Sequence, residues 1–177
     1  VKPARGGTGE DKRIIYRAAP GEEVVSKGAE RISTWIGEGG VWRVELPAAF
    51  FGGYNPYALQ LSGGWLNYGN WHHRGDVYLN GEAFYETQTR PEVGQQQHRW
   101  FCEANERTTT IWAHFGDADP NRELAEINVR ESVFMPEQSG LKYITVDGFQ
   151  LMHSAENWQP PGLELQLGTI GPRMGKH

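Results

Sequence analysis

The residues best suited to chemistry lie in one long aromatic stretch, residues 51–75 (FGGYNPYALQLSGGWLNYGNWHHRG). Large rings alternate there with Gly, Asn and Pro, and two adjacent histidines, His72 and His73, follow the last ring. Loops lie on the surface and carry function more often than packing, so a long loop this rich in rings predicts a binding surface. The rings are those of Tyr54, Tyr57, Trp65, Tyr68 and Trp71.

His72 and His73 are the candidate metal ligands of this loop. Neighbouring residues of a strand point to opposite faces, so the two rings cannot both bind one ion without distortion. No third ligand is evident, and the single Cys102 excludes an internal disulfide and a multi-cysteine zinc site. The glycines of residues 1–12 are not a phosphate loop, because no strand precedes them and no helix follows. The sequence therefore predicts no metal and no cofactor, with structural or rim roles for the histidines.

Charge and composition narrow the class of protein. The net charge is −5 with both signs dispersed, so no basic stripe suggests a nucleic-acid partner. No run of eighteen apolar residues could span a bilayer, and no signal peptide is visible. Cys102 is expected to be a buried apolar residue in the strand around Trp100 and Phe101. One free cysteine favours a disulfide-free setting such as the cytoplasm.

Residues 127–152 (INVRESVFMPEQSGLKYITVDGFQLM) give the clearest indication of the fold of the chain. They contain two strand candidates, 127–134 and 143–152, joined by a Pro/Glu/Gly turn, and the second alternates with period two. An apolar strand that runs into the Asp147-Gly148 corner and straight on into another is typical of a coil of a right-handed parallel β-helix. Such coils stack and bury their inward side chains on one another.

A similar unit lies near the start of the chain. Residues 13–18 form a strand candidate, 19–22 a turn, and 24–32 a second strand with a kink at Gly28. We therefore expect an all-β chain: the first coils of a right-handed parallel β-helix, interrupted by an inserted antiparallel β-sandwich. The expected division is residues 1–36 for the first coil, 37–126 for the insert and 127–177 for the later coils. The alternative is one ordinary β-sandwich that contains all these strands.

The expected insert consists of short strands joined by turns, with little helix. Glycines 37, 39 and 40 predict a hairpin, after which Trp42, Val44 and Leu46 fall on one face of a half-buried strand. Asn80-Gly81 between two apolar runs predicts another hairpin. Residues 99–103 and 109–115 are expected strands, and residues 87–98 a polar, mobile loop.

Eight strings follow one another along nearly the whole chain: KPARGG, DKRIIYRAAPGEEVVSKGAERI, LPAAFFGGYNPY, GDVYLNGEAFYE, TTTIWAHFGDADPN, EINVRESVFMPE, GLKYITVDGF and WQPP. In this order they resemble the N-terminal part of the glycoside hydrolase family 120 β-xylosidases and related β-helix proteins. The resemblance implies a right-handed parallel β-helix with an inserted β-sandwich, and hydrolysis of xylosides and xylo-oligosaccharides with retention at the anomeric carbon.

Retention needs two carboxyl groups close together, a nucleophile and a general acid. In the family these come from later coils, so the resemblance implies that neither is in this chain, and no catalytic residue is assigned. The pairs Glu22/Glu23 and Asp117/Asp119 lie in expected turns, where solvated charge is the better interpretation. The ends of the chain look abrupt, which predicts a fragment whose missing part is C-terminal.

The resemblance implies one sugar-binding position. A tryptophan in the insert loop of the family reaches the sugar site, and Trp65 is the matching residue here. A ring face can stack on the apolar face of a pyranose, although Trp65 could instead pack in the sandwich core. We assign Trp71, His72 and Trp158 to the same candidate substrate-binding set; Trp158 could equally lie at the interface between insert and helix. The segment 66–74 departs from the family pattern.

Two functions remain open from the sequence. The first is the N-terminal portion of a retaining β-xylosidase-like hydrolase that supplies scaffold and an aromatic subsite wall. The second is a non-catalytic carbohydrate-binding or assembly module. The expected partners are a xylose-containing oligosaccharide and, because an end coil exposes its stacking face, either a further copy of the chain or the remaining C-terminal part. No nucleic acid or membrane partner is expected.

Overall fold

A computed structural model of the chain describes residues 1–61, 69, 71–156 and 168–171. These residues form strands, turns and loops, and α1 (Arg90–Val93) is the α-helix among them. The expected all-β class is thereby confirmed. Within the described ranges, no helix has the length and apolar character needed to cross a bilayer.

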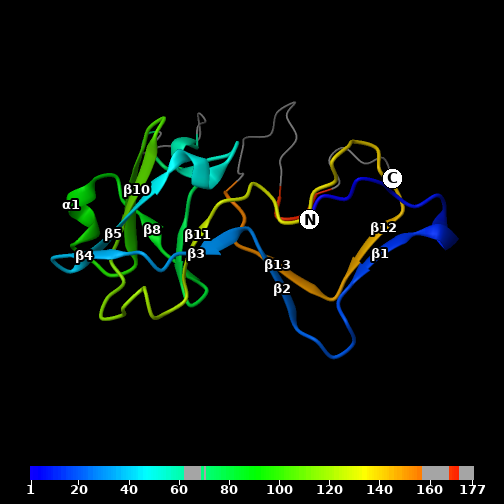
Figure 1. The fold of residues 1–177 in the computed structure, drawn as a ribbon, viewed down its shortest axis with the longest axis horizontal. Coiled ribbons are helices and arrows are strands. Elements are labelled where there is room, and N and C mark those ends of the chain that lie inside the picture. The colour runs from blue at the N-terminus through cyan, green and yellow to red at the C-terminus, as the bar shows by residue number, and fades with distance from the viewer. Residues whose placement is uncertain (62–68, 70, 157–167, 172–177) are drawn as a thin grey trace.

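Two pairs of parallel strands join the beginning of the chain to residues 144–152. β1 (Ile14–Arg17) pairs with β12 (Ile144–Asp147), and β2 (Val24–Lys27) pairs with β13 (Phe149–Met152). Figure 1 shows the early strands in blue beside the late strands in orange, with a sharp corner between the two pairs. Gly148 lies at that corner with φ +79°, so the Asp147-Gly148 turn lies where the sequence predicts it.

The paired strands follow the alternation expected of a sheet with one packed face. In β1, Ile14 and Tyr16 are half-buried, whereas Ile15 and Arg17 are exposed. The Tyr16 ring meets the buried Phe134 edge to face, with ring centroids 5.2 Å apart. Phe134 therefore covers the inner face of β1, and its segment makes an isolated parallel bridge to Ile170.

The single strand expected over residues 24–32 is two strands in two different sheets. β2 ends at Lys27, and β3 (Ala29–Arg31) pairs with β11 (Ala125–Asn128) instead of continuing along β13. The break lies at Gly28, where a Cβ atom would lie 2.7 Å from the backbone oxygen of His153. Only glycine permits this close approach of two backbones, so the predicted kink is the point at which the chain changes sheets.

The prediction of a strand over residues 127–134 is also wrong, both in the extent of the strand and in the strands with which it pairs. β11 ends at Asn128 and pairs antiparallel with β3 and with β6 (Val77–Leu79). Beyond it, the N–H groups of Val129 and Arg130 both donate to the Gly28 carbonyl, at 2.8 and 3.0 Å. The chain turns around that carbonyl, so β11 belongs to the sheet of the intervening segment.

The segment between the two parallel pairs folds as two facing sheets. In the five-stranded sheet the order is β4 (Ile36–Glu38), β5 (Val41–Pro47), β10 (Thr108–Ala113), β9 (Arg99–Ala104) and β8 (Tyr85–Glu86). In the four-stranded sheet the order is β3, β11, β6 and β7 (Glu82–Ala83). Short 3₁₀ turns, η1 (Glu10–Lys12), η2 (Ala48–Phe51) and η3 (Pro56–Ala58), complete the described elements.

The sequence suggested a wholly antiparallel insert, but the five-stranded sheet contains a parallel pair of strands, β8 and β9. Phe84 interrupts the run that the sequence predicts as one return strand, and its buried ring enters the core. The chain then passes to the other sheet, where β8 pairs with β9 in parallel. Phe84 thus separates β7 from β8 in the way that Gly28 separates β2 from β3.

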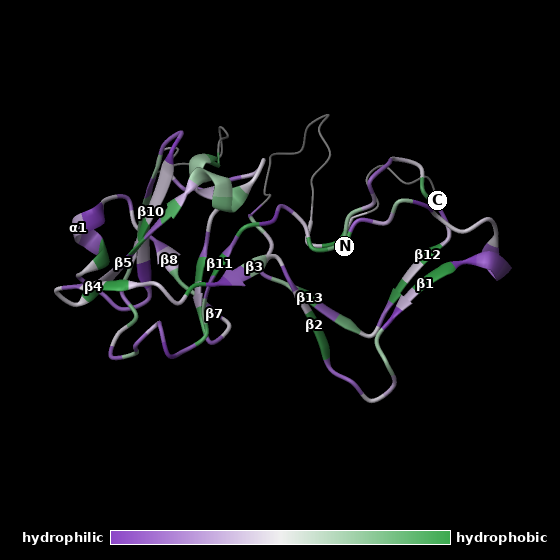
Figure 2. Cartoon of the chain, viewed as in Figure 1, coloured by the Kyte–Doolittle hydropathy of each residue, from purple (hydrophilic) through white to green (hydrophobic). Residues whose placement is uncertain are grey.

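One apolar core lies between the two sheets. Both sheets contribute side chains to it, which is the packing of a β-sandwich. Figure 2 shows hydrophobic residues on several strands of both sheets, whereas β3 is largely hydrophilic. The core residues are Ile32, Trp35, Val44, Leu46, Phe51, Tyr57, Val77, Phe84, Trp100, Cys102, Ile111, Ala113, Phe115, Ala125 and Ile127.

The turns that the sequence marked are present. Gly39 and Gly40 join β4 to β5 with φ +62° and +95°. Asn80 and Gly81 join β6 to β7 with φ +52° and +91°, and two positive values are the signature of a type I′ hairpin.

The expected polar loop at residues 87–98 is partly a packed element. α1 lies within it, with Pro91 in its first turn, and Val93 is completely buried. A single apolar side chain thus anchors a segment whose composition otherwise predicts a solvated loop.

Candidate functional site

A short antiparallel ladder closes the base of the aromatic loop. The N–H of Leu61 donates to the His72 carbonyl at 2.7 Å, and the N–H of Arg74 donates to the Leu59 carbonyl at 2.9 Å. Gln60 and His73 form the bridge between these two bonds. The loop therefore leaves the sandwich and returns to it at one place.

The described residues of the predicted sugar-binding set lie at this base. Trp71 and His72 are half-buried, and their rings stack with centroids 3.6 Å apart and planes 28° apart. Trp65 and Trp158 lie outside the described residues. Glu156 does lie at the base, because its N–H donates to the Arg74 carbonyl at 3.0 Å. Trp158 follows Glu156 by two positions in the sequence.

Not every ring of the stretch faces solvent. Tyr57 is completely buried and meets Trp100 edge to face, with ring centroids 5.7 Å apart. The Asn55 side chain caps η3 by accepting the Tyr57 N–H at 3.0 Å. Since this ring packs in the sandwich, the expected exposed aromatic surface excludes Tyr57.

Both histidines approach one buried carboxylate, contrary to the expectation that they face opposite ways. Nδ1 of His73 lies 2.5 Å from Oε1 of Glu86, and Nδ1 of His72 lies 3.5 Å from Oε2. The His73 N–H also donates to Oε2 at 2.8 Å. Alternation governs a regular strand, but here it fails because His73 belongs to an isolated bridge.

Two further carboxyl groups, those of Asp76 and Glu156, lie near the two histidines and Glu86. Burial, and then the negative charge of Glu156, raises the pKa of Asp76 to about 7. Burial also raises the pKa of Glu156, and the nearby His72 opposes that change. The loop base therefore combines stacked rings with acidic groups, of which Asp76 has a pKa of about 7, and sequence reasoning missed Asp76, Glu86 and Glu156. They come from three separate segments, and no sequence signal connects them.

The residues that could hold a metal lie just beneath the loop base. Nδ1 of His73, a carboxylate oxygen of Glu86 and Sγ of Cys102 all lie within 4.8 Å of one another. Cys102 is buried, as the sequence predicts, and burial raises the pKa of its thiol.

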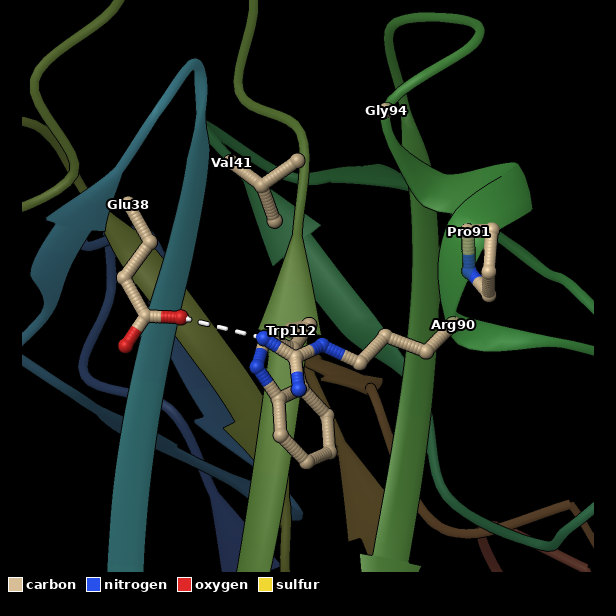
Figure 3. Close-up of a pocket in the computed structure, with 6 residues that line it drawn as sticks. All are labelled: Glu38, Val41, Arg90, Pro91, Gly94 and Trp112. Carbon is tan, nitrogen blue, oxygen red and sulfur yellow. Dashed lines mark hydrogen bonds and ion pairs between the residues drawn. The ribbon is translucent and has the colours of Figure 1, made fainter.

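A separate pocket of about 380 Å³ lies on the outer side of the five-stranded sheet, beside α1 (Figure 3). The guanidinium of Arg90 lies over the Trp112 ring, 4.6 Å from its centroid, and reaches Glu38 at 3.4 Å. This pocket contains none of the residues predicted to bind sugar. Its lining is Glu38, Val41, Arg90, Pro91, Gly94 and Trp112.

The carboxylate pairs considered from the sequence lie in turns. Glu22 and Glu23 are exposed, and Glu23 accepts a hydrogen bond from the Gln150 side chain at 2.8 Å. Asp117 is exposed, while Asp119 accepts the N–H of Asn121 at 3.0 Å within its own turn.

Comparison with known proteins assigns this arrangement to a family. A family model described as "Glycoside hydrolase 120, insertion domain" matches residues 32–99 and 89–127. The chain belongs to glycoside hydrolase family 120. The family 120 match begins at Ile32, just after β3, and ends within β11, so it covers most of the two facing sheets.

A solved structure, the complex structure of XylC with xylose, is similar over 97% of this chain, with 43% sequence identity and a TM-score of 0.89. The chain spans 31% of the XylC chain. No curated protein matches the chain. The resemblance drawn from the sequence strings is therefore confirmed at the level of the family.

Proposed function

We propose that this family 120 chain is the N-terminal portion of a retaining β-xylosidase-like glycoside hydrolase that acts on xylosides and xylo-oligosaccharides. In this proposal the chain supplies scaffold and one aromatic wall of a sugar subsite. The observation that carries it is the similarity to XylC, a protein solved with xylose, over 97% of the chain at 43% identity. In this proposal the catalytic carboxylates lie outside this chain, which spans 31% of XylC.

The proposed scaffold is the beginning of a right-handed parallel β-helix. The boundaries expected at residues 36 and 127 move to Gly28 and Asn128, because β3 and β11 belong to the four-stranded sheet of the insert. The parallel registers of β1 with β12 and of β2 with β13 support it, as does the glycine corner at Gly148. Among the described residues each of these strands has one partner, so each leaves a row of backbone groups unpaired. A stacked coil would satisfy such a row.

The proposed subsite wall consists of Trp65, Trp71, His72 and Trp158. Trp71 and His72 lie where the aromatic loop meets the segment that leads to Trp158. A ring can cover the apolar face of a pyranose, and carboxylates such as Glu156 and Asp76 accept hydrogen bonds from sugar hydroxyls.

A first experiment concerns catalysis. Retaining hydrolysis needs a nucleophile and a general acid roughly 5–5.5 Å apart, and we assign neither to this chain. The chain is therefore expected to release no nitrophenol from a nitrophenyl β-xyloside, whereas the full-length protein should release it. Turnover by the chain would mean that the catalytic carboxylates lie within it.

A second experiment concerns the wall. Trp71→Ala should weaken the binding of xylo-oligosaccharides to the full-length protein about fivefold, for about 1 kcal/mol of stacking. Tyr85→Ala is the matched control, because this ring is exposed on β8 and belongs to no proposed subsite. Equal affinities of the two variants would remove Trp71 from the wall. Sugar binding by a full-length protein that has no hydrolase activity would instead favour a non-catalytic binding module.

A further inference from the structure

Beneath the aromatic loop, three side chains of metal-binding type converge from three segments. His73 comes from the bridge at the loop base, Glu86 from β8 and Cys102 from β9. Their donor atoms, Nδ1, a carboxylate oxygen and Sγ, lie within 4.8 Å of one another. Ligands of one ion must converge in this way, and these three are far apart in the sequence.

The surroundings of the three donors are those of a closed site. The side chains of Glu86 and His73 are 5% and 16% exposed, and Cys102 is buried on β9. His72 is more open, and its Nδ1 lies 3.5 Å from the second Glu86 oxygen. An ion could therefore enter from the His72 side, and His72 is a further donor beside the cluster.

We propose that His73, Glu86 and Cys102 form a binding site for a divalent transition-metal ion. A set of one imidazole nitrogen, one carboxylate oxygen and one thiolate sulfur suits Zn²⁺, which accepts all three in a tetrahedral site. The fourth position is taken by water or by His72.

Charge balance favours an ion at this place. A thiolate rather than a thiol binds a metal ion, so Cys102 gives up its proton on binding. The thiolate of Cys102 and the carboxylate of Glu86 then carry two negative charges, which one divalent ion neutralises in a buried site.

The bound ion would fasten the aromatic loop to the sandwich. His73 lies in the ladder that closes the loop, whereas Glu86 and Cys102 lie on adjacent strands of the five-stranded sheet. A metal bridge between them would fix the direction in which the loop leaves the sandwich. This site requires no sugar binding, so it can hold even where the proposed function fails.

Cobalt titration of the full chain, without a polyhistidine tag, tests the proposal directly. Co²⁺ in a site with a thiolate ligand should give visible d–d bands and a near-ultraviolet charge-transfer band, saturating at one equivalent. Zn²⁺ should displace it, and a chelator should lower the melting temperature of the zinc-loaded chain. A wild-type chain that shows neither the charge-transfer band nor a chelator effect overturns the proposal and leaves a hydrogen-bonded His–Glu pair only.

Variants assign the ligands. Cys102→Ser should abolish the charge-transfer band, and His73→Gln should weaken Zn²⁺ binding beyond the about 10- to 100-fold typical of outer-shell partners. Glu103→Gln is the matched control, because it removes an exposed carboxylate next to Cys102 on the other face of β9. Cys102 is the single cysteine of the chain, so unchanged d–d bands and an unchanged Zn²⁺ affinity in a folded Cys102→Ser chain would show that the ion binds elsewhere.

Discussion

The hydroxyl of Tyr57 lies 3.2 Å from Oδ1 of Asn128, and both side chains are completely buried. The same Asn128 oxygen accepts the N–H of Asp76 at 2.8 Å, and its amide nitrogen lies 3.2 Å from the Arg74 carbonyl and 3.4 Å from the Ser154 carbonyl. Asn128 therefore joins the loop base, the end of β11 and the segment after β13.

Replacing Asn128 with alanine should destabilise the chain by about 2–4 kcal/mol, because several buried backbone groups lose their partner at once. Chemical denaturation followed by tryptophan fluorescence measures the change. Gln138→Ala, at an exposed position, serves as control and should stay within about 0.5 kcal/mol of the wild type. An equally small effect at Asn128 would contradict its role as the junction.

Gly75 and Gly53 should respond oppositely to alanine. A Cβ on Gly75 would lie 2.4 Å from the Tyr57 ring, whereas a Cβ on Gly53 would meet nothing within 4 Å. Gly75→Ala should therefore cost about 1–3 kcal/mol or more through overpacking, and Gly53→Ala should be neutral or slightly stabilising. Thermal melting of the two variants decides this, and similar melting temperatures would refute the close packing of Gly75 on Tyr57.

The buried ion pair between Lys27 and Glu126 should matter more than its exposed counterpart. Lys27 Nζ lies 2.6 Å from the Glu126 carboxylate, which is 7% exposed. Lys27→Met removes the lysine partner of that buried carboxylate, which keeps His153 Nδ1 at 3.7 Å, and should cost about 3 kcal/mol. Arg17→Met breaks a pair whose side chains are 59% and 51% exposed, and should cost at most about 1 kcal/mol. Equal losses in denaturation experiments would argue against burial as the cause.

The free energy of unfolding should decrease as pH rises from about 4 to about 7, because of Asp76. Its pKa is raised to about 7 in the folded chain, so the unfolded chain loses this proton first and binds fewer protons across that interval. Asp76→Asn removes the titrating carboxyl group, and the amide oxygen of the asparagine can still accept the Val77 N–H.

The Asp76→Asn variant should therefore be more stable than the wild type at pH 8, by an amount that shrinks as pH approaches 4. Denaturation curves at several pH values, subtracted from those of the wild type, isolate Asp76 from the nearby Glu156 and Glu86. A difference that does not change with pH would contradict the raised pKa.

Much of the local structure was predictable because it depends on neighbouring residues. Asn80-Gly81 specifies its hairpin through two positive φ angles, and the alternation of Trp42, Val44 and Leu46 specifies a half-buried strand. The Asp147-Gly148 corner is likewise a local backbone property. The quoted strings were sufficient to identify the family.

Only the tertiary structure decided which strands share a sheet and which side chains meet. The sequence predicts a kink at Gly28. That the chain changes sheets there follows from the backbone of residues 153 and 154, which lies against Gly28. Glu86, Cys102 and Asp76 carry no signal in the sequence, because their proximity to the histidines arises from pairing between distant segments. Local sequence specifies backbone turns and the period of burial, whereas a site built by long-range contacts exists only once the chain has folded.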